Sequence, residues 1–374
     1  MKEQSAAQGP LRGMRVVEFA GLGPAPFASM MLSDMGADVV CIARPGQGTR
    51  PPGDFVNRGR RVVELDLKSR DHIAQVLDLI SAADILIEGF RPKVMERLGL
   101  GPDVALKRNP RLVYGRMTGW GQEGPLAQAA GHDINYIAIT GALDSFRATN
   151  GETVSPLNLV GDYGGGALYL VVGVLAAVIE AKSSGKGQVV DAAMCDGVSS
   201  MLTMFHSLRA LGRWPGGPRT NMLDGGAHFY RTYECKDGGF MSVGAIEPQF
   251  YAELRKRAGL DEECYDAHMS RDEWPKLQEK MAAVFKTKTR DEWTALLEGT
   301  EACAAPVVSL FDAPAHPHLA ARETFVNAHG GIQPAPAPRF SRTPSTIQGT
   351  AAVTPVDATD ILAQWSEAAD AQAS

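Results

Sequence analysis

Short apolar runs alternate, along the first half of the chain, with segments that have a helical pattern. The run MRVVEFA from Met14 to Ala20 precedes the helical pattern ASMMLSDMGA, and further β-rich runs begin at Ala37, Arg61, Ala83 and Arg111. Turn residues bound each run, which is typical of buried strands. Strands that alternate with helices favour right-handed crossovers, so this half predicts an α/β fold with a mostly parallel sheet.

The pattern changes after Trp120. Helices are predicted to begin at Gly131 and Asp162, and another strand, QVVDAAM from Gln188 to Met194, leads into a further helix. The helix from Asp162 carries the longest apolar run, Ala167 to Ile179, which is shorter than the ~20 residues of a membrane span. We therefore expect a buried helix there and no membrane span.

Two segments rich in glycine and proline divide the rest of the chain: GRWPGGPRTN at 212–221 and QPAPAPRF at 333–340. Between them, residues 227–244 predict antiparallel strands with a turn at KDGG, and charged helices follow. The expected organisation is a large Rossmann-like α/β domain at 1–212, a linker at 213–225, a smaller α+β domain at 226–330, and a linker and C-terminal segment at 331–374 that returns to the large domain.

Composition narrows the possible functions. The formal charge of −6 disfavours nucleic-acid binding. The N-terminus has no apolar stretch, so no signal peptide is predicted. The five scattered cysteines are typical of a reducing compartment, and we expect a cytoplasmic protein. The tight histidine pair, His316 and His318, brackets Pro317 in a predicted loop, and no metal site is expected.

Common nucleotide and hydrolase motifs are missing from the sequence, which has no P-loop, no GxGxxG after the first strand and no GxSxG. The candidates are instead side chains at predicted strand-to-helix junctions: His132 and Asp133 in AGHDINY, and Asp162 in GDYGGG. Free N–H groups at helix starts favour a nearby negative charge, such as a developing enolate oxygen. The same residues also suit ordinary N-caps or a structural histidine, and this alternative stays open.

A further candidate, Glu247, lies in the apolar segment VGAIEPQFY. A carboxylate in apolar surroundings needs a partner, and a histidine would suit.

Several long motifs resemble those of the α-methylacyl-CoA racemases, a family within the family III CoA-transferase superfamily. The matching strings, in order, are AGHDINY, PLNLVGDYGGG, SGKGQVVDAAM, NMLDGGA, VGAIEPQFY, ACAAPV and PAPRFSRTP. The resemblance covers almost the whole chain. It implies an isomerase that interconverts (2R)- and (2S)-2-methylacyl-CoA thioesters by two-base proton transfer through an enolate. It also implies that no cofactor is needed and that the chain forms an interlocked homodimer.

The resemblance also implies roles for individual residues. His132 and Asp162 correspond to the two bases, and Glu247 to the group that supports His132. The backbone N–H of Asp133 is the expected donor to the enolate oxygen. CoA contacts are implied at Arg44, Leu65, Asp66, Leu67, Lys68, Arg97, Gly131, Ile134, Asn135 and Tyr136. Without the resemblance, Arg44 and Lys68 would be interpreted as solvated surface charges.

Two features of the sequence bear on which acyl-CoA substrate is bound. His228 stands where the family has proline, so it could alter substrate entry or add a titrating group. Met194, Met201, Met204 and Met222 could form an adaptable surface for acyl chains, although core filling is the simpler explanation.

Two other functions stay open. A CoA transferase of the same superfamily would use Asp162 as a nucleophile and would need no second base. A non-catalytic acyl-CoA binding protein would bind the thioester without exchanging its α-proton. The combination of His132 with Glu247 favours the racemase over both.

Overall fold

The computed structural model describes residues 8–373, and for residues 369–373 the backbone alone. The described chain divides into two compact units. Unit 1 runs to Thr140, resumes over Leu157–Met201 and continues from Pro317 onward. Unit 2 comprises Gly141–Pro156 and Leu202–His316. The domain boundaries expected from the sequence, with a linker at 213–225, stay a prediction.

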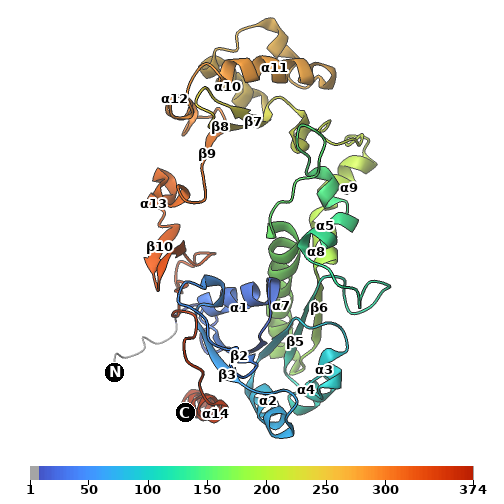
Figure 1. Ribbon diagram of the computed structural model, residues 1–374, viewed down its shortest axis with the longest axis vertical. Helices are drawn as coiled ribbons and strands as arrows, with labels where there is room; N and C mark the ends of the chain where they lie inside the picture. The colour runs from blue at the N-terminus through green and yellow to red at the C-terminus, as the bar shows by residue number, and fades with distance from the viewer. Residues whose placement is uncertain (1–7, 374) are drawn as a thin grey trace. The chain divides into compact units, whose positions relative to one another are not determined.

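Unit 1 is built on a six-stranded parallel sheet with the order β3-β2-β1-β4-β5-β6 (Figure 1). The strands are β1 (Arg15–Phe19), β2 (Asp38–Ala43), β3 (Arg60–Glu64), β4 (Ile85–Glu88), β5 (Val113–Thr118) and β6 (Val189–Ala193). All six coincide with predicted strands, so the predicted parallel α/β fold is confirmed. The strand order reverses between β1 and β4, as in Rossmann-type sheets, which bind ligands in the crevice at this point.

Helices cover both faces of this sheet because neighbouring strand residues point to opposite sides. Val16 packs with residues of α1 (Pro24–Asp34) and α7 (Tyr169–Ser184) on one face. Val17 packs with residues of α2 (Arg70–Ala82) and α14 (Ala358–Ala373) on the other face (Figure 1). The shorter elements of unit 1 are η1 (Phe55–Asn57), α3 (Val94–Arg97), α4 (Pro102–Arg108), α5 (Asp133–Ile139), η2 (Leu159–Leu168), α8 (Met194–Met201), α13 (Pro317–Ala321), β10 (Phe325–Ala328) and β11 (Gly331–Pro334).

Both predicted helix starts after Trp120 need correction. Helix α5 begins at Asp133, with His132 rather than Gly131 as its N-cap. Asp162 does not begin a helix, because it lies inside the π-helix η2, which starts at Leu159 and continues directly into α7. The glycines after Asp162 are part of this π-helix.

The continuous helical stretch Leu159–Ser184 is long and apolar enough to cross a membrane by length and composition, and half of its most apolar window is buried. The core helix of a globular domain passes the same test. Within α7, Leu170 and Val174 are fully buried in the core beside the sheet, as the sequence predicted, whereas Val172 and Ile179 on the opposite side are exposed.

Unit 2 contains a three-stranded antiparallel sheet with the order β7-β8-β9. The strands β7 (Tyr230–Glu234) and β8 (Phe240–Gly244) form the hairpin that the KDGG turn predicted. The sheet shares a core with the helices α10 (Pro248–Ala258), α11 (Trp274–Phe285) and α12 (Arg290–Leu297). The third strand of the sheet is β9 (Ala304–Val307). The other elements of unit 2 are α6 (Ala142–Ser145), α9 (Thr203–Ala210), η3 (Met222–Gly226), η4 (Glu263–Ala267), η5 (Arg271–Glu273) and η6 (Ala313–Ala315).

Candidate active site

A cavity of about 360 Å³ opens at the carboxyl ends of β1, β4 and β5, where the strand order reverses. Its walls include the loops that follow these three strands, at 21–25, 89–92 and 117–120. His132 and Asp162 complete the lining together with Gly131, Tyr136 and Met194. Two candidate residues that lie 30 positions apart in the sequence are thereby brought into one cavity of unit 1.

His132 enters the cavity from the N-cap position of α5. Its backbone is extended, and its N–H donates to Asn135 Oδ1 at 3.1 Å, which closes the first turn of the helix. The residue is exposed, and it lines the cavity. An imidazole in this position is free to accept a proton from a bound molecule.

Asp162 is half-buried on the π-helix η2. Its Oδ2 accepts from Asn158 Nδ2 at 3.2 Å, and its backbone N–H donates to Asp133 Oδ2 at 2.7 Å. Burial raises the pKa of the Asp162 carboxyl, the negative charge of Asp133 adds to this, and the bond from Asn158 opposes it. The carboxylate is therefore a stronger base than an exposed aspartate.

The loop after β1 comes close to this carboxylate. Gly23 has φ +72°, and a Cβ at this position would lie 2.9 Å from Asp162 Oδ2. A side chain there would be strained and would also crowd the carboxylate.

Trp120 and Tyr136 form an aromatic wall of the cavity, with ring centroids 4.7 Å apart and an edge-to-face arrangement. The Tyr136 hydroxyl donates to the Gly131 carbonyl, and burial raises the pKa of this phenol. Trp120 was not a predicted site residue. Its position directly after a buried strand, beside Gly119 and Gly121, is the sequence signal that could have identified it.

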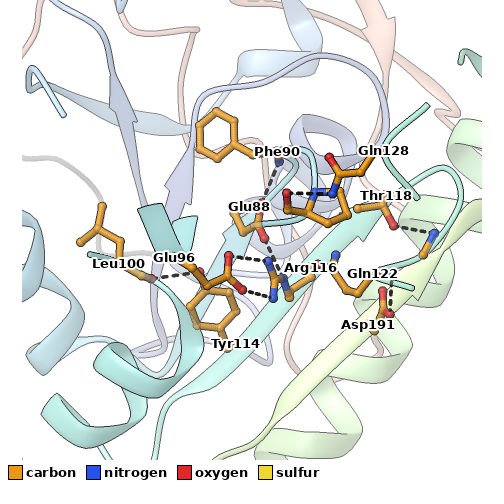
Figure 2. Close-up of polar contacts among 12 residues, drawn as sticks. Glu88, Phe90, Glu96, Leu100, Tyr114, Arg116, Thr118, Gln122, Gln128 and Asp191 are labelled. Carbon is orange, nitrogen blue, oxygen red and sulfur yellow. Dashed lines mark hydrogen bonds and ion pairs between the residues drawn. The ribbon is translucent and has the colours of Figure 1, made fainter. Parts of the chain in front are cut away.

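A buried network of charged residues, Glu88 with Arg116 and Glu96, contacts the loop at 89–92 through the Phe90 N–H (Figure 2). Glu88 is fully buried at the end of β4, where it accepts the Phe90 N–H at 2.7 Å and Arg116 Nε at 2.9 Å. Arg116 also donates to both carboxylate oxygens of Glu96 on α3, at 2.9 and 3.3 Å. Burial raises the pKa of Glu88 to about 7, against the lowering effects of the Phe90 N–H and Arg116. Charged residues inside two strands that are otherwise apolar were the sequence signal for this network, which the sequence analysis missed.

Of the residues assigned to CoA, Gly131 and Tyr136 line the cavity, whereas the others do not. Arg44 and the segment 65–68 follow the neighbouring strands β2 and β3. Arg44 is exposed directly after β2, and its loop is held by Glu64, which accepts the N–H groups of Gly46 and Gly48 at 2.9 and 2.8 Å. The segment Leu65–Lys68 follows β3, with Asp66 and Lys68 exposed.

Individual residues of this assigned set differ in exposure. Leu65 is only 4% exposed and packs in the core, so its side chain is not free for a ligand. Leu67 is partly buried against the same core. Arg97 on α3 and both Ile134 and Asn135 on α5 are exposed.

Glu247 belongs to unit 2, where it is the N-cap of α10. Its side chain is exposed. The apolar surroundings expected from the segment VGAIEPQFY are therefore wrong for this side chain, because its apolar neighbours Ala245 and Tyr251 turn into the core of unit 2.

His228 lies in the core of unit 2 and is fully buried. Its Nε2 is 2.7 Å from the Tyr251 hydroxyl, and burial lowers its pKa to about 3. The interpretation of His228 as a group that titrates near the site or alters entry is not supported by this environment.

The four methionines occupy different environments. Met194 is buried and lines the cavity, whereas Met201 and Met204 are exposed and Met222 packs against the core of unit 2. No group of three or more His, Cys, Asp or Glu side chains that could hold a metal ion lies within residues 8–373.

Comparison with known proteins gives a consistent picture. The sequence model described as CoA-transferase family III matches residues 11–355. The chain is 43% identical to "Alpha-methylacyl-CoA racemase" of Mus musculus and 42% identical to that of Homo sapiens, in each case over 90% of this chain and 87% of the relative. The crystal structure of a CaiB/BaiF family protein from Brucella suis has the same fold, with a TM-score of 0.81 and 24% identity over 96% of this chain and all of the other.

Proposed function

The chain belongs to CoA-transferase family III, and from this premise we propose that it racemises 2-methylacyl-CoA thioesters at the α-carbon. The observation that carries the proposal is the meeting of His132 and Asp162 in one cavity at the crevice of the sheet. The similarity to the mouse and human racemases over 90% of the chain supports the same reaction.

The reaction needs two bases on opposite faces of the α-carbon. One removes the α-proton, and the other returns a proton to the opposite face of the enolate. In the proposed mechanism neutral His132 accepts from the 2S substrate, and ionised Asp162 accepts from the 2R substrate. The raised pKa of Asp162 suits this role, because a general base works best when its pKa approaches the working pH.

The enolate oxygen carries the charge that forms during the reaction. We assign its stabilisation to the backbone N–H of Asp133, which directly follows His132 at the first position of α5. A fixed dipole aimed at a developing charge costs no reorganisation when the charge appears. This arrangement involves only groups of the chain, so racemisation is expected without an added metal, nucleotide or acceptor acid.

The CoA portion is assigned to the exposed residues at the edge of the sheet. Arg44 and Lys68 follow the neighbouring strands β2 and β3 and would bind phosphates. The residues between them, Leu65, Asp66 and Leu67, are assigned to the same contact, with Asp66 exposed. Arg97 on α3 and residues 134–136 on α5 would extend this contact toward the cavity.

The supporting carboxylate is assigned to a second copy of the chain. In the proposed homodimer, the exposed Glu247 of one subunit orients His132 of the other and stabilises its cationic form, as the third member of a catalytic triad does. Such a site is complete only when unit 1 of one copy meets unit 2 of the other.

Deuterium incorporation from heavy water tests the two-base mechanism. Each pure enantiomer is incubated with wild type, His132→Ala and Asp162→Asn, and exchange at the α-carbon is followed by NMR. Both variants should lose net racemisation, and each should keep slow exchange from one enantiomer only: 2S for Asp162→Asn and 2R for His132→Ala. Asp103→Asn, an exposed aspartate of α4, is the matched control and should behave as wild type.

Two results would contradict the mechanism. Equal residual exchange from both enantiomers in one variant would indicate a single mobile base. Turnover of the wild type only after addition of a second carboxylate would indicate the transferase, with Asp162 as nucleophile.

Mixing two inactive variants tests the shared site. His132→Ala and Glu247→Gln are unfolded and refolded together, so that mixed dimers form. A mixed dimer has one intact site, and we expect activity to return to about a quarter of the wild-type value in a random mixture. No recovery in a mixture shown to contain mixed dimers would place Glu247 and His132 of the same copy together. Wild-type activity of Glu247→Gln alone would remove Glu247 from the mechanism.

A further inference from the structure

The side chain of Asp133 connects the two proposed bases. Asp133 directly follows His132 in the chain and is only 7% exposed. Its Oδ2 accepts the backbone N–H of Asp162 at 2.7 Å. This hydrogen bond ties the first turn of α5 to the π-helix η2. It joins Asp162, one proposed base, to the residue that follows His132, the other.

The two helices approach so closely here that glycine is required. A Cβ on Gly161, the residue before Asp162, would lie 2.5 Å from Asp133 Oδ2 and 3.2 Å from a methyl carbon of Ile137 on α5. Any side chain at position 161 would push the Asp133 carboxylate away from the Asp162 N–H. The contact is therefore built into the packing of α5 on η2.

The charge of Asp133 also acts on Asp162. The titratable groups that influence Asp162 are Asp133, whose charge raises its pKa, and His132, whose charge lowers it. The charge of Asp162 in turn raises the pKa of Tyr136, the third titratable neighbour. Removal of the Asp133 charge should lower the pKa of Asp162.

We propose that the Asp133 side chain is a positioning residue, which sets the placement of Asp162 relative to His132 through its bond to the Asp162 backbone. This role is separate from that of the Asp133 backbone N–H, and it rests on the proposed racemisation. A displacement of about 1 Å in such a pair can cost ~10²-fold in rate.

Two substitutions separate the geometry from the charge. In Asp133→Asn, the amide oxygen can still accept the Asp162 N–H, but the negative charge is gone. In Asp133→Ala, both are lost. A variant that only weakened the fold would lower the yield of active protein and would leave the shape of the pH profile unchanged.

We expect Asp133→Asn to keep most of its kcat for the 2R enantiomer, with the acid limb of the pH profile moved to lower pH. The direction follows because Asp162 must be ionised to accept a proton, and its pKa falls without the neighbouring charge. Asp133→Ala should lose ~10²-fold in kcat at every pH, with little change in KM. Asp103→Asn serves as control and should match wild type in both measurements.

A second measurement keeps the inference independent of turnover. The carboxyl carbon of Asp162, labelled with 13C, is titrated by NMR in wild type and Asp133→Asn, and it should titrate at lower pH in the variant. If the wild type exchanges no α-deuterium, the proposed function fails, yet this titration still tests the contact. An unmoved titration of Asp162 together with a wild-type kcat in Asp133→Ala would overturn the inference.

Discussion

The buried histidine His228 should make the stability of unit 2 depend on pH. Burial is the main cause of its pKa of about 3, and the nearby His268 adds to the lowering. An unfolded histidine titrates near its ordinary value of 6.5. Below pH 6.5 the unfolded chain binds a proton at His228, whereas the folded chain does not. The free energy of unfolding is therefore highest above pH 6.5 and falls as the pH drops toward the folded pKa.

The magnitude follows from the two pKa values. At about pH 5, protonation stabilises the unfolded histidine by about 2 kcal/mol, whereas the folded histidine gains almost nothing. This difference depends mainly on the unfolded pKa, since the folded one lies well below pH 5. His228→Gln removes the titrating group and keeps an amide within reach of the Tyr251 hydroxyl. The stability lost between about pH 7.5 and pH 5 should therefore be about 2 kcal/mol smaller in the variant.

Hydrogen exchange of the β7 and β8 amides, corrected for the intrinsic pH dependence of exchange, reports the opening free energy of unit 2. The measurement is made at both pH values on wild type, His228→Gln and His206→Gln. His206 is an exposed histidine of the same unit, so its variant should follow wild type. His268 also has a pKa lowered by burial, but it is present in all three proteins. An equal loss of stability in His228→Gln and wild type would refute the reasoning.

Two further predictions concern unit 1. Arg116→Met should cost about 1–3 kcal/mol at neutral pH, measured by urea unfolding, because it removes the hydrogen bonds of the buried Glu88, which can neutralise since its pKa is about 7. A cost below about 0.5 kcal/mol would contradict this, and Glu88→Gln in the same chain should recover part of the loss. Arg44→Ala should raise KM for the CoA thioester and leave kcat nearly unchanged, since a phosphate contact stabilises the ground state and the transition state equally. Arg12→Ala, at another exposed arginine, is the control. A fall in kcat at constant KM would give Arg44 another role.

The positions of the strands followed from the sequence because their signals are local. Each buried strand of unit 1 is a short run of β-branched and apolar residues between turn residues, and the KDGG turn marks the hairpin of unit 2. Candidate residues at the junctions could be named for the same reason. In Rossmann-type sheets the strand ends are where ligands bind, so His132 was found by its place after a strand.

Other features needed the tertiary structure because they depend on distant partners. A π-helix is rare and short, so no sequence pattern identified this one, and Asp162 was interpreted as a helix start although it lies inside a helix. The network of Glu88, Arg116 and Glu96 joins separate elements, and no local pattern pairs such charges.

Exposure, in the same way, is decided by packing. The segment VGAIEPQFY predicted apolar surroundings for Glu247, but the side chain of this N-cap residue is exposed. His228 was expected near the site, but the core of unit 2 encloses it. The local order of residues determined the strands, the turns and the types of side chain available for chemistry. The packing of elements remote in sequence decided which side chains are buried, charged and brought together, because desolvation and contact depend on neighbours that the local sequence does not contain.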